Sequence, residues 1–387
     1  MTPFYIEDLW DSSDVICVDQ RGNMRGKELR GFFNGEAPKP DSGLDHLIAD
    51  YKRFATSVTK KYSKTKTDLS GYNVLKCVED VNELRQALGY DKISLRGQSF
   101  GCQWSFAIMR KHPEIVERAL LSGVEPLNNG YDMPSDVFAA VKRIWKVIDK
   151  DPRFAPYLPE GGMAEAAETV IKRLEAGVEV KGKGGFLGLG EPTVVRILGP
   201  YDFPWKEPAQ ILELYHGQTK RWARPRGRAW GNAELLLHLI DSSLGVTPER
   251  REKLWNDPAI RYLSRKGFAP LIATADIWPS PDVGDEFRTP IKCDIPIVFV
   301  NGDWDTNTPV ENMHEIAPFF PNSHKLVVHQ AGHATINSSM LKQHPKVMKQ
   351  LMEFMRTGAM DGLPDEIEFE PYRKFDPPKF KPNGDSK

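Results

Sequence analysis

A serine between two glycines, in the segment G-Q-S-F-G at residues 97–101, is the first place where residue types and spacing indicate covalent chemistry. The segment follows a short apolar run at residues 92–96 and precedes a helical pattern at residues 102–111. Such a strand–turn–helix is a nucleophile elbow, in which the helix N-terminus favours developing negative charge. The positions two residues before and two residues after the serine favour glycine, because the turn is too sharp for larger side chains there. We therefore predict Ser99 as a nucleophile and the Phe100 N–H as an oxyanion donor.

A serine hydroxyl needs a general base, and His333 is the best placed of the nine histidines. It lies four residues after the last predicted strand, residues 325–329. In proteins with a nucleophile elbow, the catalytic histidine follows the last strand of the sheet. The base in turn needs a carboxylate that holds its tautomer. The segment G-D-W-D-T-N-T-P at residues 302–309 offers two. We favour Asp305 as this carboxylate and expect Asp303 to hydrogen-bond the loop backbone.

The elements that must position these residues alternate along the chain. Short apolar, β-branched runs predict strands, and apolar residues at three- and four-residue steps predict helices. The predicted strands are residues 14–19, 92–96, 119–123, 296–300 and 325–329, and the predicted helices are residues 74–88, 102–111, 310–319 and 338–355. This order predicts an α/β fold with a mostly parallel sheet flanked by helices. The nearly continuous apolar run at 14–19 predicts a strand buried on both faces.

The character of the sequence changes between residues 126 and 290. This segment is helical in pattern, rich in tryptophan and tyrosine, and interrupted by proline and glycine, so we predict an inserted helical cap. The tail from residue 358 is rich in Pro, Asp, Glu and Lys, which predicts an irregular or partly disordered wrap. The predicted organisation is a first core part at 1–125, the cap at 126–290, a second core part at 291–357 and the tail at 358–387.

Composition excludes several classes of function. The chain has 387 residues, 40% of them hydrophobic and 27% charged, with a net charge of −1, so we expect a globular protein without a nucleic-acid or membrane partner. No secretory signal and no transmembrane run are visible in the sequence as given, and the compartment and oligomeric state stay open. No metal or organic cofactor is implied. The four scattered cysteines, Cys17, Cys77, Cys102 and Cys293, predict reduced or buried thiols, or one disulfide in an oxidising compartment.

Short motifs in a fixed order make the chain resemble the proline-iminopeptidase and tripeptidyl-aminopeptidase-like α/β-hydrolases, the S33 type of serine peptidase. These motifs are D-Q-R-G at 19–22, L-R-Q-A-L-G at 84–89, G-Q-S-F-G at 97–101, H-P-E at 112–114, W-P at 278–279, G-D-x-D-x-x-T-P at 302–309 and G-H at 332–333. The likeness spans about residues 14–355, with the cap poorly matched. It implies an α/β-hydrolase fold and Asp305, the second Asp of its loop, as the triad acid. It also implies release of N-terminal residues from peptides, although some members act on esters or amides.

The amino-terminal part departs from this family. Residues 23–26, N-M-R-G, replace the usual small-Gly-Ser continuation. The family also has earlier strands and a Gly-rich loop that donates a second N–H to the oxyanion, whereas this chain begins about a dozen residues before the 14–19 run. We therefore expect a chain that is N-terminally truncated relative to its relatives, or a rearranged strand pairing. Because losing one oxyanion donor costs about 10²–10³ in turnover, we expect weak or absent activity.

Three functions follow from these observations. An exopeptidase using Ser99, His333 and Asp305 is our first prediction. An esterase or amidase for small apolar acyl substrates is the second, and a weakly active or non-catalytic homologue is the third. Glu125, directly after a predicted strand, is either a ligand for a substrate ammonium or, as we favour, a solvated loop acid.

Overall fold

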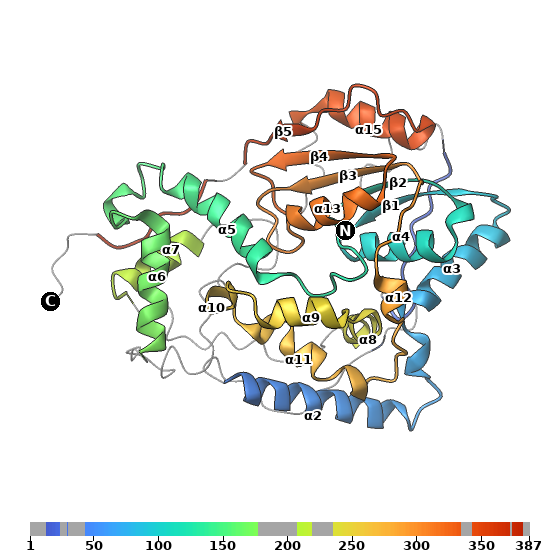
Figure 1. The fold of residues 1–387 in the computed structure, drawn as a ribbon, viewed down its shortest axis with the longest axis horizontal. Coiled ribbons are helices and arrows are strands. Elements are labelled where there is room, and N and C mark those ends of the chain that lie inside the picture. The colour runs from blue at the N-terminus through green and yellow to red at the C-terminus, as the bar shows by residue number, and fades with distance from the viewer. Residues whose placement is uncertain are drawn as a thin grey trace.

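A five-stranded parallel sheet forms the centre of the molecule (Figure 1). The computed structural model describes residues 13–23, 29, 43–176, 207–218, 235–333, 343–371 and 374–381. The strands are β1 Ile93–Gln98, β2 Val116–Ser122, β3 Ile297–Gly302, β4 Ser323–His329 and β5 Glu366–Glu368, and they lie in the order β1-β2-β3-β4-β5. The predicted α/β fold, a mostly parallel sheet flanked by helices, is confirmed.

Helices cover both faces of this sheet, and the strand side chains alternate between them. The helices are α3 Val74–Ala87, α4 Phe100–Lys111, α13 Val310–Ile316 and α15 Pro345–Thr357. Leu121 and Phe299 pack with residues of α4 and α13, whereas Leu120 and Val298 pack with residues of α15 on the other face. Figure 1 shows α15 on one side of the sheet and α4 and α13 on the other. Burial on both faces explains the apolar runs at residues 119–121 of β2 and 297–300 of β3.

The strand that we predicted at residues 14–19 is wrong. These residues form no strand, and Ile16 and Val18 are 45% and 37% exposed. Val15 alone packs against the core beside α15. A cavity of about 570 Å³, lined on one side by Val15 and Ile16 and on the other by residues 92–96, lies between this segment and β1. An apolar run shows only that its side chains can be buried; a strand also requires a hydrogen-bonding neighbour, and none of the described strands pairs with it.

A helix that the sequence analysis missed, α2 (Leu44–Tyr62), lies far from the sheet, along the lower edge of Figure 1. Its apolar residues recur at helical spacing, but the lysine-rich composition of the segment obscured them. Phe54 and Val58 are buried against Leu239 of α8 and against Trp278. Helix α2 therefore packs on helices from the 126–290 segment, although it precedes the sheet in sequence.

Helices make up the regular structure of residues 126–176, 207–218 and 235–290, and no strand occurs in these described parts. They are α5 Pro134–Ile148, α6 Gly162–Glu175, α7 Glu207–Tyr215, α8 Leu235–Leu244, α9 Pro248–Trp255, α10 Ile260–Leu263, α11 Ala269–Ile272 and α12 Asp285–Arg288. Helices α5, α6 and α7 share a hydrophobic core that also includes Trp304 and Phe375. The helical character of the segment is thus confirmed where it is described, and its division from the rest as a cap stays a prediction. None of the described helices has the length and apolarity required to cross a bilayer.

The tail after α15 is more ordered than we predicted. Strand β5 pairs in parallel with β4, with Val327 opposite Glu366. Phe369 and Phe375 are buried, and the ring of Phe375 lies 5.6 Å from that of Trp304. We predicted an irregular segment from the polar composition of the tail. Composition does not reveal that two of its aromatic residues, Phe369 and Phe375, are buried and hold the tail against the rest of the protein.

The cysteines form no disulfide. Cys77 and Cys102 are buried, Cys293 is half-buried and Cys17 is exposed, and all four are free thiols. Burial raises the pKa of the Cys77 thiol to about 12 and raises that of Cys102 as well. These two cysteines are therefore packing residues that stay protonated at neutral pH.

Candidate active site

Ser99 occupies a sharp turn between β1 and α4. Its backbone has φ 56° and ψ −125°, a conformation that non-glycine residues rarely adopt. The Ser99 N–H donates to the carbonyls of Ser122 and Gly123 at 3.1 and 3.2 Å, so the end of β2 holds the turn in place. A residue kept in this conformation by its surroundings is typical of a functional site.

The two glycines of G-Q-S-F-G play different parts. A Cβ on Gly97 would lie 2.4 Å from the Gly101 carbonyl oxygen, so only glycine fits where the chain crosses itself. A Cβ on Gly101 would meet no described atom within 4 Å. The predicted steric need for glycine therefore holds at position 97 and is wrong at position 101, among the described contacts.

Asp305 and His333 lie in contact at the carboxyl ends of β3 and β4. The Nδ1 atom of His333 is 2.9 Å from Oδ2 of Asp305, whose side chain has no solvent exposure. The Thr308 hydroxyl donates to the same Oδ2 at 2.7 Å. Backbone N–H groups of Asn307 and Thr308 donate to Oδ1 at 2.8 Å each. The carboxylate is thus fixed by its own loop, with one oxygen facing the imidazole.

Asp303 performs a separate task in the same loop. Its Oδ1 accepts the Gln330 N–H at 2.7 Å, and its Oδ2 lies 2.9 Å from Nδ1 of His329. Gln330 has φ 62°, so this bond holds a left-handed turn just before the segment that carries His333. His329 also contacts Glu366, and these two carboxylates raise its pKa. The geometry matches the backbone-holding role that we predicted for Asp303.

Three residues that the sequence analysis did not single out position His333. The Gln98 side-chain amide donates to the His333 carbonyl at 3.0 Å. A Cβ on Gly123 would lie 3.1 Å from His333 Cε1, and a Cβ on Gly302 would lie 2.1 Å from the Ala331 carbonyl oxygen. Gly123 ends the predicted strand 119–123 and Gly302 follows the predicted strand 296–300 by two residues, and these positions are the sequence signals that could have identified them.

Gly123 brings Ser99 and His333 to the same point of the sheet edge. Its carbonyl accepts the Ser99 N–H, and its α-carbon lies against the imidazole. No hydrogen bond joins the Ser99 hydroxyl to His333 among the described contacts. Instead, Nδ2 of Asn307 lies 3.2 Å from Nε2 of His333. The structure therefore places the predicted serine and histidine around one glycine, with an asparagine at the nitrogen that would serve as base.

Part of the chain that carries the candidate site matches a known protein family. Residues 268–366, which include β3, the Asp305 loop and His333, match the family described as TAP-like protein. The carboxyl-terminal part of the chain is thus similar to TAP-like proteins, and the parallel sheet with flanking helices is consistent with an α/β-hydrolase fold. No curated protein matches the sequence.

Several solved structures that are similar to this chain are hydrolases. A thermophilic esterase from Thermogutta terrifontis is 18% identical, with 73% of this chain and 72% of that chain covered and a TM-score of 0.30. The α/β-hydrolase MGS-M2 from a Medee basin deep-sea metagenome library is 14% identical, with 84% and 88% covered and a TM-score of 0.32. The meta-cleavage product hydrolase CumD from Pseudomonas fluorescens IP01 is 14% identical, with 76% of each chain covered and a TM-score of 0.33. At these identities and scores, the solved structures add no argument to the fold described above.

Three carboxyl groups interact with one another near the Asp305–His333 pair, and two of them, Glu125 and Asp132, also interact with Asp305. Glu125 follows β2, Asp132 precedes α5 and Asp241 lies in α8. Burial and the neighbouring Asp132, Asp241 and Asp305 raise the pKa of Glu125 well above its ordinary value. Burial first, and then neighbouring carboxylates, raise the pKa of Asp132 to about 7 and that of Asp241 to about 8. Glu125 is therefore half-buried among acids and is not the solvated loop acid that we favoured.

Phe100, the predicted oxyanion donor, is the first residue of α4. Its N–H is one of the N-terminal helix amides that have no acceptor within the helix. The Phe100 ring stacks on Trp104 with centroids 6.2 Å apart, which fixes the start of the helix next to Ser99. The position is thus compatible with donation to an oxyanion on a Ser99 adduct.

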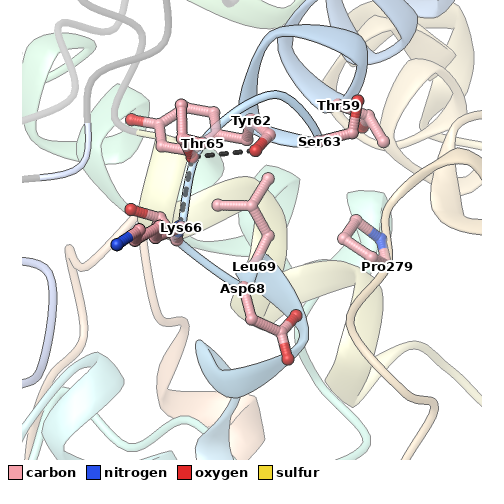
Figure 2. A pocket seen from close by; sticks show the side chains of 9 residues that line it. Thr59, Tyr62, Ser63, Thr65, Lys66, Asp68, Leu69 and Pro279 are labelled. Carbon is pink, nitrogen blue, oxygen red and sulfur yellow. Dashed lines mark hydrogen bonds between the residues drawn. The ribbon is translucent and has the colours of Figure 1, made fainter.

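A separate cavity of about 340 Å³ lies at the end of α2 (Figure 2). Its lining includes Tyr62, Lys66, Leu69 and Pro279, and Figure 2 shows the hydrogen bond that the Thr65 hydroxyl donates to the Tyr62 carbonyl. None of the predicted site residues lines it. The hydrolase therefore has a surface hollow here that takes no part in the candidate active site.

Proposed function

We propose that this α/β-hydrolase is a serine peptidase that releases N-terminal residues from peptides. Ser99 acts as nucleophile, His333 as general base and Asp305 as the carboxylate that orients the base. The observation that carries the peptidase assignment is the group formed by Glu125, Asp132 and Asp241 beside this pair.

The proposed reaction is acyl transfer through a covalent intermediate. Nε2 of His333 accepts the Ser99 proton while Oγ bonds to the substrate carbonyl carbon, and the Phe100 N–H donates to the resulting oxyanion. The C–N bond then breaks as the imidazolium gives its proton to the leaving amine. Water, deprotonated by the same nitrogen, attacks the acyl-enzyme and releases the acid and free Ser99.

Asp305 supports this cycle through its fixed position. Its Oδ2 faces Nδ1 of His333 at 2.9 Å, which keeps the proton on Nδ1 and leaves Nε2 as the base. The imidazolium that forms during the reaction is then paired with a buried carboxylate. The backbone N–H bonds to Oδ1 hold that carboxylate still while the charge develops.

The acid group explains why a free amino terminus is the expected recognition element. Buried carboxyls that crowd one another resist ionisation, as the raised pKa values of Asp132 and Asp241 show. Arg250 and Asn312 stabilise the charged form of Asp132 only in part, and a substrate ammonium would add positive charge that favours ionisation of the group. A hydrolase for small apolar acyl esters has no use for such a group next to its base, because burying acids is costly.

The test compares substrates with and without the ammonium. We expect fluorophosphonate to label the wild-type protein at Ser99 and not the Ser99→Ala variant. We expect alanyl and prolyl anilides to be cleaved at least about tenfold better than their N-acetyl forms, because a partly buried charge pair contributes about 1.4 kcal/mol or more.

Matched variants separate the alternatives. Glu125→Gln and Asp132→Asn should raise KM for free-amine anilides and leave the KM for short acyl esters unchanged. Equal rates on acetylated and free substrates, with esters preferred, would identify an esterase. A wild-type protein with no adduct at Ser99 would contradict catalysis and favour a binding protein.

A further inference from the structure

We infer that Asn307 is a positioning residue that holds the base of the resting enzyme away from Ser99. The inference rests on the proposed function, because it concerns how His333 reaches the nucleophile. Its starting observation is the 3.2 Å contact between Nδ2 of Asn307 and Nε2 of His333.

The hydrogen-bond partners of His333 determine which atom carries the proton. Nδ1 lies 2.9 Å from a buried carboxylate oxygen of Asp305 and 3.0 Å from the Thr308 hydroxyl. An ionised carboxylate only accepts, and the Thr308 hydroxyl already donates to that same oxygen. Nδ1 must therefore be the protonated nitrogen, and Nε2 carries a lone pair.

This assignment also fixes the orientation of the Asn307 amide. A lone pair needs a donor, and the amide nitrogen is the only part of the Asn307 side chain that donates. The main-chain N–H of Asn307 donates to Asp305 Oδ1 at 2.8 Å. The backbone of Asn307 is thus tied to the triad loop, so its side chain can rotate away from Nε2 without moving the carboxylate.

The contact competes directly with the proposed chemistry. One imidazole lone pair accepts one well-aligned hydrogen bond, and the Ser99 hydroxyl needs that lone pair to lose its proton. In the structure the Asn307 amide lies at the lone pair of His333 Nε2, and no described hydrogen bond joins Ser99 to His333. Ser99 becomes reactive only when Asn307 is displaced, so the contact keeps the unoccupied enzyme less reactive.

The charges around His333 set the sign of the expected pH effect. Asp305 contacts the imidazole and Asp132 interacts with it electrostatically, and both favour the protonated form. The Asn307 amide stabilises only the neutral form, because a protonated Nε2 cannot accept a hydrogen bond. Removing the amide should therefore move the acid limb of the reactivity profile to higher pH.

The first measurement is the second-order rate of fluorophosphonate labelling at Ser99. We expect Asn307→Ala to raise this rate about fivefold at pH 8, the factor that corresponds to one neutral hydrogen bond. Asn307→Asp should lower it, because a carboxylate at Nε2 favours the protonated imidazole. Asn322→Ala, which removes an exposed amide bonded to the Asp294 carbonyl, is the matched control and should leave the rate unchanged.

The second measurement does not depend on catalysis. In the Ser99→Ala protein, the NMR titration midpoint of the His333 imidazole should rise by about 0.7 pH unit on adding Asn307→Ala. Thermal unfolding of each variant checks that the fold is kept, and Asn307→Ser serves if Asn307→Ala does not fold.

The outcomes are distinguishable. Slower labelling of Asn307→Ala with an unmoved titration midpoint would overturn the inference, since Asn307 would then merely support the loop. Faster labelling with a raised midpoint supports it. If no variant is labelled at Ser99 but the midpoint rises, the proposed function fails while the assignment of Asn307 to the His333 lone pair stands.

Discussion

Asp303 and Asp305 lie two positions apart in one loop, but their side chains point in different directions and contact different histidines. Asp305 is buried and faces the imidazole of His333, whereas Asp303 holds the backbone of Gln330 and contacts His329. Both pairs place a carboxylate 2.9 Å from a histidine Nδ1. Only His333 lies against Gly123, whose carbonyl also binds the Ser99 backbone, so only that pair can reach the nucleophile.

Exchanging each carboxylate for an amide tests this assignment. Asp305→Asn should lower kcat by about 10⁴-fold, because an amide that donates to Nδ1 selects the wrong tautomer. Asp303→Asn, the matched control, retains an acceptor for the Gln330 N–H and should cost far less. The measurement is kcat on the best anilide substrate, with thermal unfolding as a check on the fold. A larger loss for Asp303→Asn would reverse the roles.

At the scale of elements, close backbone crossings at the carboxyl ends of β1 and β3 build the site. Gly97 lets the end of β1 pass the first turn of α4, and Gly302 lets the end of β3 pass the segment that carries His333. The crossing at Gly302 brings together residues from two connections of the parallel sheet, whereas the crossing at Gly97 shapes the single turn that carries Ser99. A side chain at either position would push the reacting groups apart.

Alanine at the two glycines of the elbow should have opposite effects. Gly97→Ala places a Cβ 2.4 Å from a carbonyl oxygen, so the backbone must shift, and we expect a loss of about 1–3 kcal/mol in the free energy of unfolding. Gly101→Ala places its Cβ in open space near the start of α4, where alanine favours the helix by up to about 1 kcal/mol. Urea unfolding of both variants measures the difference. Equal losses at both positions would contradict the crossing as its cause.

For the whole molecule, the meeting of the sheet edge with the helices of residues 126–290 creates the acid group. Glu125 comes from the end of β2, Asp132 from the approach to α5 and Asp241 from α8. Arg143 of α5 binds Glu311 and the Asp303 carbonyl, so the same helices are also tied to the loop of the proposed triad acid. The environment of the site therefore depends on how two distant parts of the chain pack together.

The raised pKa values predict how stability depends on pH. Asp241 has a pKa of about 8 when folded and about 4 when unfolded, so between these values the unfolded chain has released a proton that the folded chain keeps. The free energy of unfolding should therefore fall as pH rises through this window. Asp241→Asn should reduce the decrease in the free energy of unfolding between pH 5 and pH 8 by an amount on the order of 2–4 kcal/mol. Urea unfolding at both pH values measures it, with the exposed Asp276→Asn as control; an unchanged slope would contradict the burial of an uncompensated acid.

The local chemistry and the order of the elements could be predicted from the residues alone. The strand–turn–helix around Ser99, the two aspartates after β3 and the histidine after β4 could all be predicted, because backbone conformation and apolar periodicity depend on near neighbours in the chain. Parallel pairing then sends the ends of these strands to one edge of the sheet. The alternation of elements was therefore sufficient to predict which residues would gather there.

Only the tertiary structure decided which groups contact one another. It left residues 14–19 outside the sheet, placed Asn307 at Nε2 of His333, collected three acids from separate elements and fastened the tail through Phe375. Each of these outcomes depends on the burial and pairing of residues far apart in sequence. Local sequence patterns do not predict which partner a polar group has or how much free energy its burial costs. Both depend on the residues, distant in sequence, that pack around the group.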